Sequence, residues 1–148
     1  MATALRTGHV ALNVTELDRS IGFYREVLGF DLLGRLEGEG WRYARLGFDG
    51  NLLVTLWEQS SGRFAADSPG LHHLSFEAPG VAELEAIEAR LRELEVPVKY
   101  DGIAGYREGE ESGGLFFEDP DGARLEIYVT SGLNAPVPHK DAPTCGFF

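Results

Sequence analysis

The chain has 148 residues, with 13 lysines and arginines against 24 aspartates and glutamates, which gives a formal charge of −11. This balance argues against DNA or RNA as a partner, because phosphate binding needs a basic surface, and it weakly disfavours anionic membranes. The length suits one compact domain, or two small half-domains that share a core, and needs no disulfide or structural metal to fold.

The cysteine content and the apolar runs favour a cytoplasmic protein. Cys145 is the single cysteine, so an internal disulfide is impossible, and a bystander thiol is the simplest interpretation. No apolar run approaches the roughly 18 residues that span a bilayer. Residues 1–8 lack the basic-then-apolar pattern of a signal peptide.

The first half of the chain opens with a strand and a helix. His9–Val14 alternates as a strand does, and Thr15 is the predicted N-cap of a helix, with Asp18 in a capping-box-like position. The apolar residues that recur at helical spacing are Leu17, Ile21, Tyr24 and Leu28. Gly29 is predicted to end this helix.

Three strand-like segments follow, at Phe30–Leu36, Trp41–Phe48 and Leu52–Glu58. Glycines mark the first turn, and Asp49-Gly50 predicts a tight hairpin between the second and third segments. Residues 59–70 are rich in Ser, Gly and Ala and end in Pro-Gly, which is typical of a connector.

The second half repeats this order. A strand is predicted at His73–Ala78, and further strands at Val98–Tyr100, Gly114–Glu118 and Ala123–Val129, the last after an Asp-Pro-Asp-Gly turn. A helix is predicted between the first two of these strands, because apolar residues recur there at helical spacing: Val81, Leu84, Ile87, Leu91 and Leu94. Glu88 and Arg92 are predicted to form an exposed pair on it.

The predicted fold is therefore α+β: two tandem βαβββ units that form a curved, incompletely closed mixed β-sheet barrel with a central cleft. Each unit has one apolar face that must pack on a partner. We expect one domain over residues 1–148, with unit one at about 8–58, the connector at 59–70, unit two at about 71–129 and a C-terminal arm at 130–148.

Two histidines and a glutamate form a candidate metal site. His9 and His73 begin equivalent strands of the two units, and Glu126 lies in the last strand of unit two. Two imidazoles and one carboxylate leave several coordination positions open, which suits Fe(II) or Mn(II); Zn(II), Ni(II) and Co(II) are also possible. The open positions could hold a substrate through two adjacent oxygens.

Each of these residues also has a structural interpretation. A lone histidine at a strand start is more often a hydrogen-bonded structural residue than a ligand. His72 is the expected example, since next to His73 in a strand it would point to the opposite face. Glu126 and Tyr128 share one face of their strand, and a carboxylate lining a cleft would need a partner. From spacing alone, the metal-binding and structural interpretations stay equally open.

Three blocks of sequence resemble the vicinal oxygen chelate superfamily. The blocks are His9–Val14 with Leu17–Phe30, then His72–Phe76, then Phe117–Glu126. The superfamily contains glyoxalase I, extradiol dioxygenases, fosfomycin-resistance thiol transferases, methylmalonyl-CoA epimerases and bleomycin-resistance proteins. The resemblance covers residues 8 to 129 and implies a metal triad at His9, His73 and Glu126, without specifying a reaction.

Departures from the subfamilies narrow the choice. Glyoxalase I would place an acidic ligand where this chain has Val54. Fosfomycin transferases would place a basic residue around Ala135 and a threonine near Ala11. Bleomycin-resistance proteins bind drug without metal and usually lack the ligands that this chain keeps.

Extradiol dioxygenases share the His, His, Glu set and the Asp-Pro-x-Gly turn, but this chain departs from their signature too. It has Phe116 in place of a tyrosine, and residues 107–109 supply no upstream histidine. Tyr106, Tyr128 or His72 would have to replace that histidine as the catalytic acid or base.

Two classes of function remain. The first is a metal-dependent enzyme that chelates a small oxygen-rich substrate, with dioxygenase-like chemistry preferred over a lyase or thiol transferase. The second is a protein that sequesters a drug or metabolite, with Trp41 and Trp57 stacking on it. The main candidates for substrate contact are Asn13, Tyr43 and Trp57. The resemblance also implies a homodimer, with the metal site built within one chain or across two.

Overall fold

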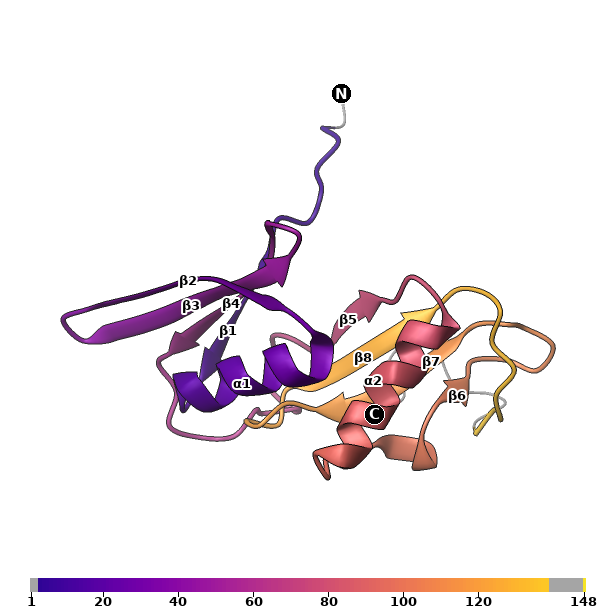
Figure 1. The fold of residues 1–148 in the computed structure, drawn as a ribbon. Coiled ribbons are helices and arrows are strands. Elements are labelled where there is room, and N and C mark those ends of the chain that lie inside the picture. The colour runs from indigo at the N-terminus through magenta and orange to yellow at the C-terminus, as the bar shows by residue number, and fades with distance from the viewer. Residues whose placement is uncertain (1–2, 139–147) are drawn as a thin grey trace. The chain divides into compact units, whose positions relative to one another are not determined.

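The computed structural model describes residues 3–138 and 148. The chain forms two compact units, Met1–Gly62 and Arg63–Phe148, each with a four-stranded mixed sheet and one long helix (Figure 1). The predicted α+β fold with two tandem units is therefore confirmed. Within the described residues neither sheet closes into a barrel. No helix in this part of the chain is long and apolar enough to cross a membrane.

The first unit contains one helix and four strands in the predicted order. The elements are β1 (Val10–Val14), α1 (Leu17–Leu28), β2 (Asp31–Gly38), β3 (Trp41–Phe48) and β4 (Asn51–Glu58). The strand order is β1-β4-β3-β2; β1 runs parallel to β4, and the other pairs are antiparallel. The two-residue hairpin at Asp49-Gly50 is confirmed, because both residues have the positive φ (48° and 75°) that such a turn requires.

Helix α1 covers one face of the first sheet. Its buried residues are Leu17, Ser20, Ile21, Tyr24 and Val27. The fully buried sheet residues are Val14, Ala44, Leu46, Val54 and Leu56. The predicted end at Gly29 is confirmed, with a left-handed φ of 72°.

The prediction of a Thr15 cap for α1 is wrong. The N-cap is Glu16, which makes no side-chain cap bond. Instead, the N–H of Leu17 donates to Oε2 of Glu58 on β4 at 2.8 Å. The helix start is thus bound by a carboxylate from the neighbouring strand, which the helix dipole also favours.

The second unit repeats the order with shorter strands. Its elements are β5 (Leu74–Glu77), α2 (Val81–Glu93), the 3₁₀ turn η1 (Lys99–Asp101), β6 (Ala104–Gly105), β7 (Gly113–Glu118) and β8 (Arg124–Val129). The order is β5-β8-β7-β6, with β5 parallel to β8. The predicted strand at Val98–Tyr100 is wrong: Val98 makes one isolated bridge to Phe117, and Tyr100 then turns into the left-handed region at φ 58°.

The core of the second unit lies between α2 and its sheet. Leu84, Ile87 and Leu91 of the helix are buried, whereas Leu94, the predicted end of the stripe, is 45% exposed because the helix stops at Glu93. The apolar face of β8 comprises Leu125, Ile127 and Val129.

The turn before β8 forms as predicted. Oδ1 of Asp119 accepts the N–H groups of Asp121 at 2.9 Å and Ala123 at 2.8 Å, and Gly122 takes a positive φ of 88°.

The segment after β8 returns along β6. The N–H of Gly105 donates to the carbonyl of Pro136 at 2.8 Å, and the N–H of Leu133 donates to the carbonyl of Glu111 at 2.9 Å. Leu133 is buried at 6% exposure. The first part of the predicted C-terminal arm is therefore packed on the second unit. Residues 139–147, with Cys145, lie outside the described residues.

Candidate functional site

The second unit brings two of the three predicted metal ligands together. His73 directly precedes β5, and Glu126 lies in the middle of β8, opposite Ser75 in the parallel β5–β8 pair. Nε2 of His73 lies 3.3 Å from Oε2 of Glu126. Because β5 and β8 are parallel neighbours, a residue at the start of one can meet a residue inside the other.

The Glu126 carboxylate is buried, at 2% exposure, and both of its oxygens have a partner. Oε2 faces His73, and Oε1 accepts a hydrogen bond from the hydroxyl of Tyr106. The side chain of His73 is only 14% exposed. Burying a carboxylate costs free energy unless the group is paired and hydrogen-bonded. The contacts with His73 and Tyr106 provide this compensation for Glu126.

His72 contacts His73 through the other ring nitrogen. The two Nδ1 atoms lie 2.8 Å apart and the rings meet edge to face. The prediction that His72 points to the opposite sheet face is wrong, because both residues precede β5 and strand alternation does not apply to them. A hydrogen bond from Nδ1–H of His73 to His72 would leave the Nε2 lone pair for a metal ion, whereas the other tautomer donates Nε2–H to Glu126.

This donor pair fits a divalent ion. Two ligand atoms that are each about 2.1 Å from one ion, at roughly a right angle, lie about 3 Å apart, close to the observed separation. A metal-ligating histidine usually has a hydrogen bond at its second nitrogen, which His72 provides here. Within residues 3–138 and 148 there is no cluster of three or more His, Cys, Asp or Glu side chains that could hold a metal.

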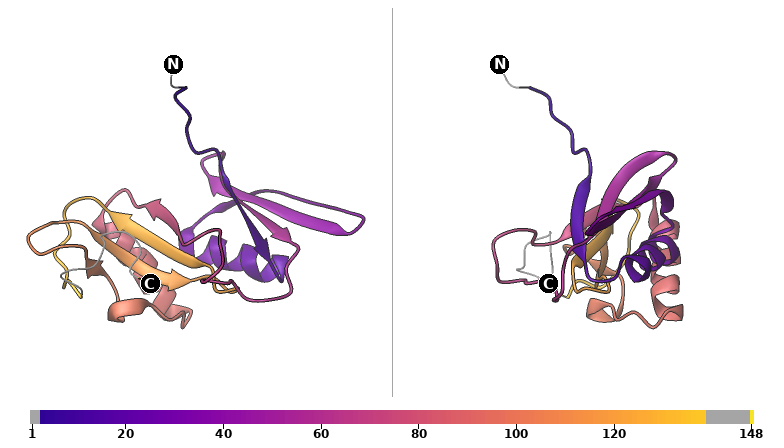
Figure 2. Two further views of the ribbon diagram at one scale, coloured as in Figure 1. Left: turned by 180° about the vertical axis from the view of Figure 1, so that it is seen from behind. Right: turned by 90° about the vertical axis from the view of Figure 1, so that its left-hand side faces the viewer.

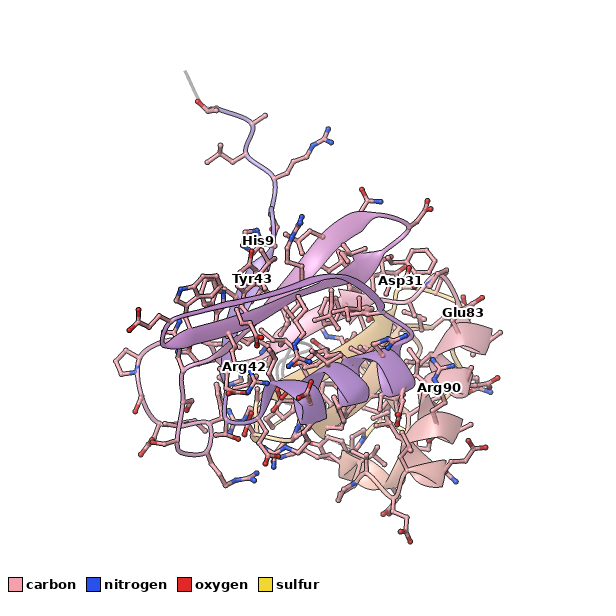
Figure 3. All side chains as sticks on the ribbon, turned by 60° about the vertical axis from the view of Figure 1, so that its left-hand side comes forward. His9, Asp31, Arg42, Tyr43, Glu83 and Arg90 are labelled. Atoms are coloured by element: carbon pink, nitrogen blue, oxygen red, sulfur yellow. The ribbon has the colours of Figure 1, made fainter. Side chains whose placement is uncertain are left out.

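The third predicted ligand, His9, belongs to the first unit. It is exposed and directly precedes β1 (Figure 3). His9 and the His73–Glu126 pair thus belong to different units, and the triad stays a prediction.

The three predicted substrate contacts share one face of the first sheet. Trp57 pairs with Asn13 of β1 and with Tyr43 of β3, so the three side chains are level across adjacent strands. The rings of Tyr43 and Trp57 stack at 4.5 Å with 12° between their planes, and Trp41 lies 5.9 Å from Tyr43. Arg42 points to the other face, toward α1, where it pairs with Asp18 (Figure 3).

The three candidate acid–base residues differ in their contacts. Tyr106 and His72 each touch one member of the His73–Glu126 pair. The hydroxyl of Tyr128 donates instead to Oε2 of Glu77 at 3.3 Å. The geometry therefore favours Tyr106 and His72 over Tyr128.

Three residues beside the pair were not among the sequence candidates. The ring of Phe148 lies 5.7 Å from the ring of His73, and Lys99 and Arg124 lie near the same Phe148 ring. Arg124 could have been found, because it is two residues before Glu126 and shares its strand face. No pattern in the sequence points to Phe148.

The chain matches one family model. Residues 6–127 match the model of the Glyoxalase/Bleomycin resistance protein/Dioxygenase superfamily. The chain belongs to this superfamily. The resemblance predicted from the sequence is thereby confirmed.

Relatives in the superfamily include dioxygenases and glyoxalases. The chain is 31% identical over 126 residues to a catechol-2,3-dioxygenase of Bacillus subtilis, which covers 82% of this chain but only 40% of the dioxygenase. It is 32% identical over 127 residues to the protein named glyoxylase I 4 of Arabidopsis thaliana, covering 80% of this chain and 67% of that protein.

Solved structures of the superfamily share the fold. A glyoxylase/bleomycin resistance protein/dioxygenase domain from Frankia has a TM-score of 0.76 at 27% identity, covering 86% of this chain and 93% of that one. The fosfomycin resistance protein FosX of Listeria monocytogenes, in complex with Mn(II) and sulfate, has a TM-score of 0.62 at 16% identity, covering 89% and 94%. The latter likeness concerns the fold alone.

Proposed function

We propose that this superfamily member is a metal-dependent enzyme in which His9, His73 and Glu126 hold one divalent ion, Fe(II) or Mn(II) before Zn(II), Ni(II) or Co(II). The substrate would be a small oxygen-rich molecule that such an ion can chelate, and the reaction is dioxygenase-like. The observation behind this proposal is the buried His73–Glu126 pair, with Nε2 and Oε2 3.3 Å apart. Support comes from the 31% identity to a catechol-2,3-dioxygenase.

When bound, the ion supplies Lewis-acid polarisation of two substrate oxygens and, as Fe(II) or Mn(II), a place for dioxygen to react. The residues of the chain orient the donors. Tyr106 holds Oε1 of Glu126 and thereby turns Oε2 toward His73. His72 holds Nδ1 of His73 and fixes the ring plane.

Tyr106 is the preferred acid–base group. Its hydroxyl hydrogen-bonds a proposed ligand, so it lies within reach of a substrate bound to the same ion. Phe116, fully buried and opposite Glu126 on β7, is an apolar neighbour that limits access of water.

The donor set disfavours the other reactions of the superfamily. The glyoxalase I position for a fourth, acidic ligand holds Val54, a fully buried apolar residue. The fosfomycin-transferase positions hold Ala11 and Ala135, which cannot contact a phosphonate through charge or a hydroxyl. A lyase or transferase therefore stays the weaker alternative within the enzyme class.

Sequestration of a drug or metabolite is the second candidate. It is favoured by the stacked aromatic rings on the first sheet, where Trp41 is 39% exposed beside Tyr43 and Trp57. Such a surface can stack on a planar ligand without metal.

The test is an anaerobic calorimetric titration of the metal-stripped chain with Fe(II) and Mn(II). We expect stoichiometric binding that is lost in His73→Ala and Glu126→Gln. Glu77→Gln is the matched control, because Glu77 lies on adjacent β5 but is exposed and bonded to Tyr128. Binding by the wild type should be followed by oxygen uptake with catechols.

A failure of the wild type to bind metal would favour the second candidate, sequestration of a drug or metabolite. Absence of metal binding in the wild type would rule out the chelating enzyme. Binding of an aromatic drug by the metal-free chain, with quenching of tryptophan fluorescence, would then indicate sequestration.

The proposal includes a cytoplasmic homodimer that acts on a small molecule and binds neither nucleic acid nor membrane. The metal site is then complete within one chain or shared by two. A monomeric mass in light scattering would contradict the dimer.

A further inference from the structure

The ring of Phe148 packs on an aromatic cluster next to the proposed metal ligands. It lies 5.7 Å from the ring of His73 and 5.6 Å from Phe116, which it meets edge to face at 82°. Tyr100 and Tyr106 pack against the same cluster. The C-terminal end lies on the face of the second sheet opposite α2 (Figure 2).

Two cations flank this ring. Nζ of Lys99 and Cζ of Arg124 each lie 5.3 Å from its centroid, within cation–π range. Lys99 comes from η1 and Arg124 from β8, so two separate elements direct positive charge at one place. Among the described residues neither cation has an acidic partner, although the chain carries a formal charge of −11.

An uncharged ring satisfies the packing of this site but gives the two cations no negative charge to pair with. The neighbouring rings accept a flat apolar ring, but a phenyl side chain offers the two cations only its π face. A ring that carries a carboxylate or a similar anionic group would keep the stacking and would also pair with Lys99 and Arg124. The next neighbour of that ring would be His73, whose Nε2 faces Glu126.

We propose that the place of the Phe148 ring, against His73, Phe116, Lys99 and Arg124, is a binding subsite for an aromatic anion, and that Phe148 and this ligand compete for it. This subsite rests on the proposed function in one respect only: its ligand is taken to be the substrate of the proposed metal-dependent enzyme. Binding to the subsite itself needs no metal, so the two proposals can fail separately.

The test is a calorimetric titration of the full chain with benzoate in the presence of a metal chelator, with benzamide as the uncharged comparison. We expect Phe148→Ala to bind benzoate at least tenfold more tightly than the wild type, because the competing ring is gone. Phe148→Leu should bind at least threefold more tightly, because its smaller side chain lacks cation–π attraction. It serves as the readout if the alanine variant does not fold.

Charge variants test the anionic part of the ligand. In the Phe148→Ala background, Arg124→Gln and Lys99→Gln should each weaken benzoate binding at least fivefold, and benzamide should bind at least fivefold more weakly than benzoate. Arg107→Gln is the control, since Arg107 is an exposed cation of the same unit that pairs with Glu110 at 3.8 Å.

Equal benzoate affinity in the wild type and in both Phe148 variants would overturn the proposal and make Phe148 an ordinary packing residue. Equal binding of benzamide and benzoate would also overturn it. Fe(II) titration of the same proteins separates the two proposals. Benzoate binding without Fe(II) binding would support the subsite and contradict the metal-dependent enzyme. Fe(II) binding without benzoate binding would support the enzyme and contradict the subsite.

Discussion

The hydroxyl of Tyr106 donates a hydrogen bond to Oε1 of Glu126, which is the carboxylate oxygen that does not face His73. The carboxylate thus has one oxygen held by the protein and one directed at the proposed partner ligand. Tyr106 lies directly after β6, and its backbone N–H donates to the carbonyl of Ser112 at 3.0 Å. The short β6–β7 hairpin therefore determines where the Glu126 carboxylate points.

Replacing Tyr106 by phenylalanine should weaken metal binding and leave the fold intact. The ring that packs on Phe116 remains, but Glu126 loses the donor that orients it. Loss of a hydrogen bond behind a metal ligand typically costs about 10- to 100-fold in affinity. Anaerobic Fe(II) titration measures the effect.

Tyr128→Phe is the matched control for that variant, because its hydroxyl donates to exposed Glu77 and not to Glu126. An equal loss of affinity in both variants would contradict the orienting role of Tyr106.

Local patterns predicted most of the fold. The helix from Leu17 to the Gly29 stop and the Asp49-Gly50 hairpin depend on neighbouring residues, and both form as expected. The Thr15 cap failed because the acceptor for the Leu17 N–H comes from Glu58, a residue distant in sequence. Local patterns cannot report which distant side chain reaches a helix end.

For the candidate site, the sequence predicted which residues take part but not most of the contacts between them. The sequence nominated His73 and Glu126 as ligands of one site without pairing their strands; in the structure β5 and β8 are parallel neighbours, and the two side chains lie 3.3 Å apart. The contacts of Tyr106 and His72 depend on loop geometry, so the sequence could nominate these side chains without pairing them. Phe148 follows a segment without periodicity, and its packing had no sequence signal.

Glu58→Ala should destabilise the first unit through the start of α1. The change removes the acceptor of the Leu17 N–H at 2.8 Å and a negative charge near the positive end of the helix dipole. Loss of a helix cap costs about 1 to 2 kcal/mol, and urea denaturation measures it as a lower midpoint.

Glu37→Ala separates this cap from simple loss of charge. Glu37 also pairs with Arg42, at 3.8 Å compared with 3.2 Å for Glu58, but it contacts no helix end. We expect a change below about 0.5 kcal/mol, as for most exposed ion pairs. Similar losses in the two variants would show that Glu58 does not act as a cap.

Gly113→Ala should destabilise the second unit and also weaken metal binding. A Cβ at Gly113 would lie 2.2 Å from the carbonyl oxygen of Ala104 and 2.6 Å from Leu133. The backbone of β6 would have to move away from β7, at a cost of about 1 to 3 kcal/mol for overpacking. Since Tyr106 directly follows β6, its hydrogen bond to Glu126 would be displaced.

Gly22→Ala is the control for the glycine variant. Gly22 lies inside α1, and a Cβ there meets nothing within 4 Å, so alanine should stabilise the helix by up to about 1 kcal/mol. Denaturation midpoints and Fe(II) affinity of both variants give the comparison. Normal Fe(II) affinity in a destabilised Gly113→Ala protein would show that β6 does not position Tyr106.

Tyr100→Phe should reduce the loss of stability at alkaline pH. Burial raises the pKa of the Tyr100 phenol above its ordinary value, because the charged phenolate is poorly solvated in the fold. The unfolded chain therefore releases this proton first. The free energy of unfolding falls as pH rises past the unfolded pKa near 10, and levels off only above the raised folded pKa. Phenylalanine has no proton to release, so urea denaturation at about pH 8 and about pH 10.5 should show a smaller decline in the variant. An identical decline in both proteins would mean that Tyr100 ionises equally readily in the folded and unfolded chains.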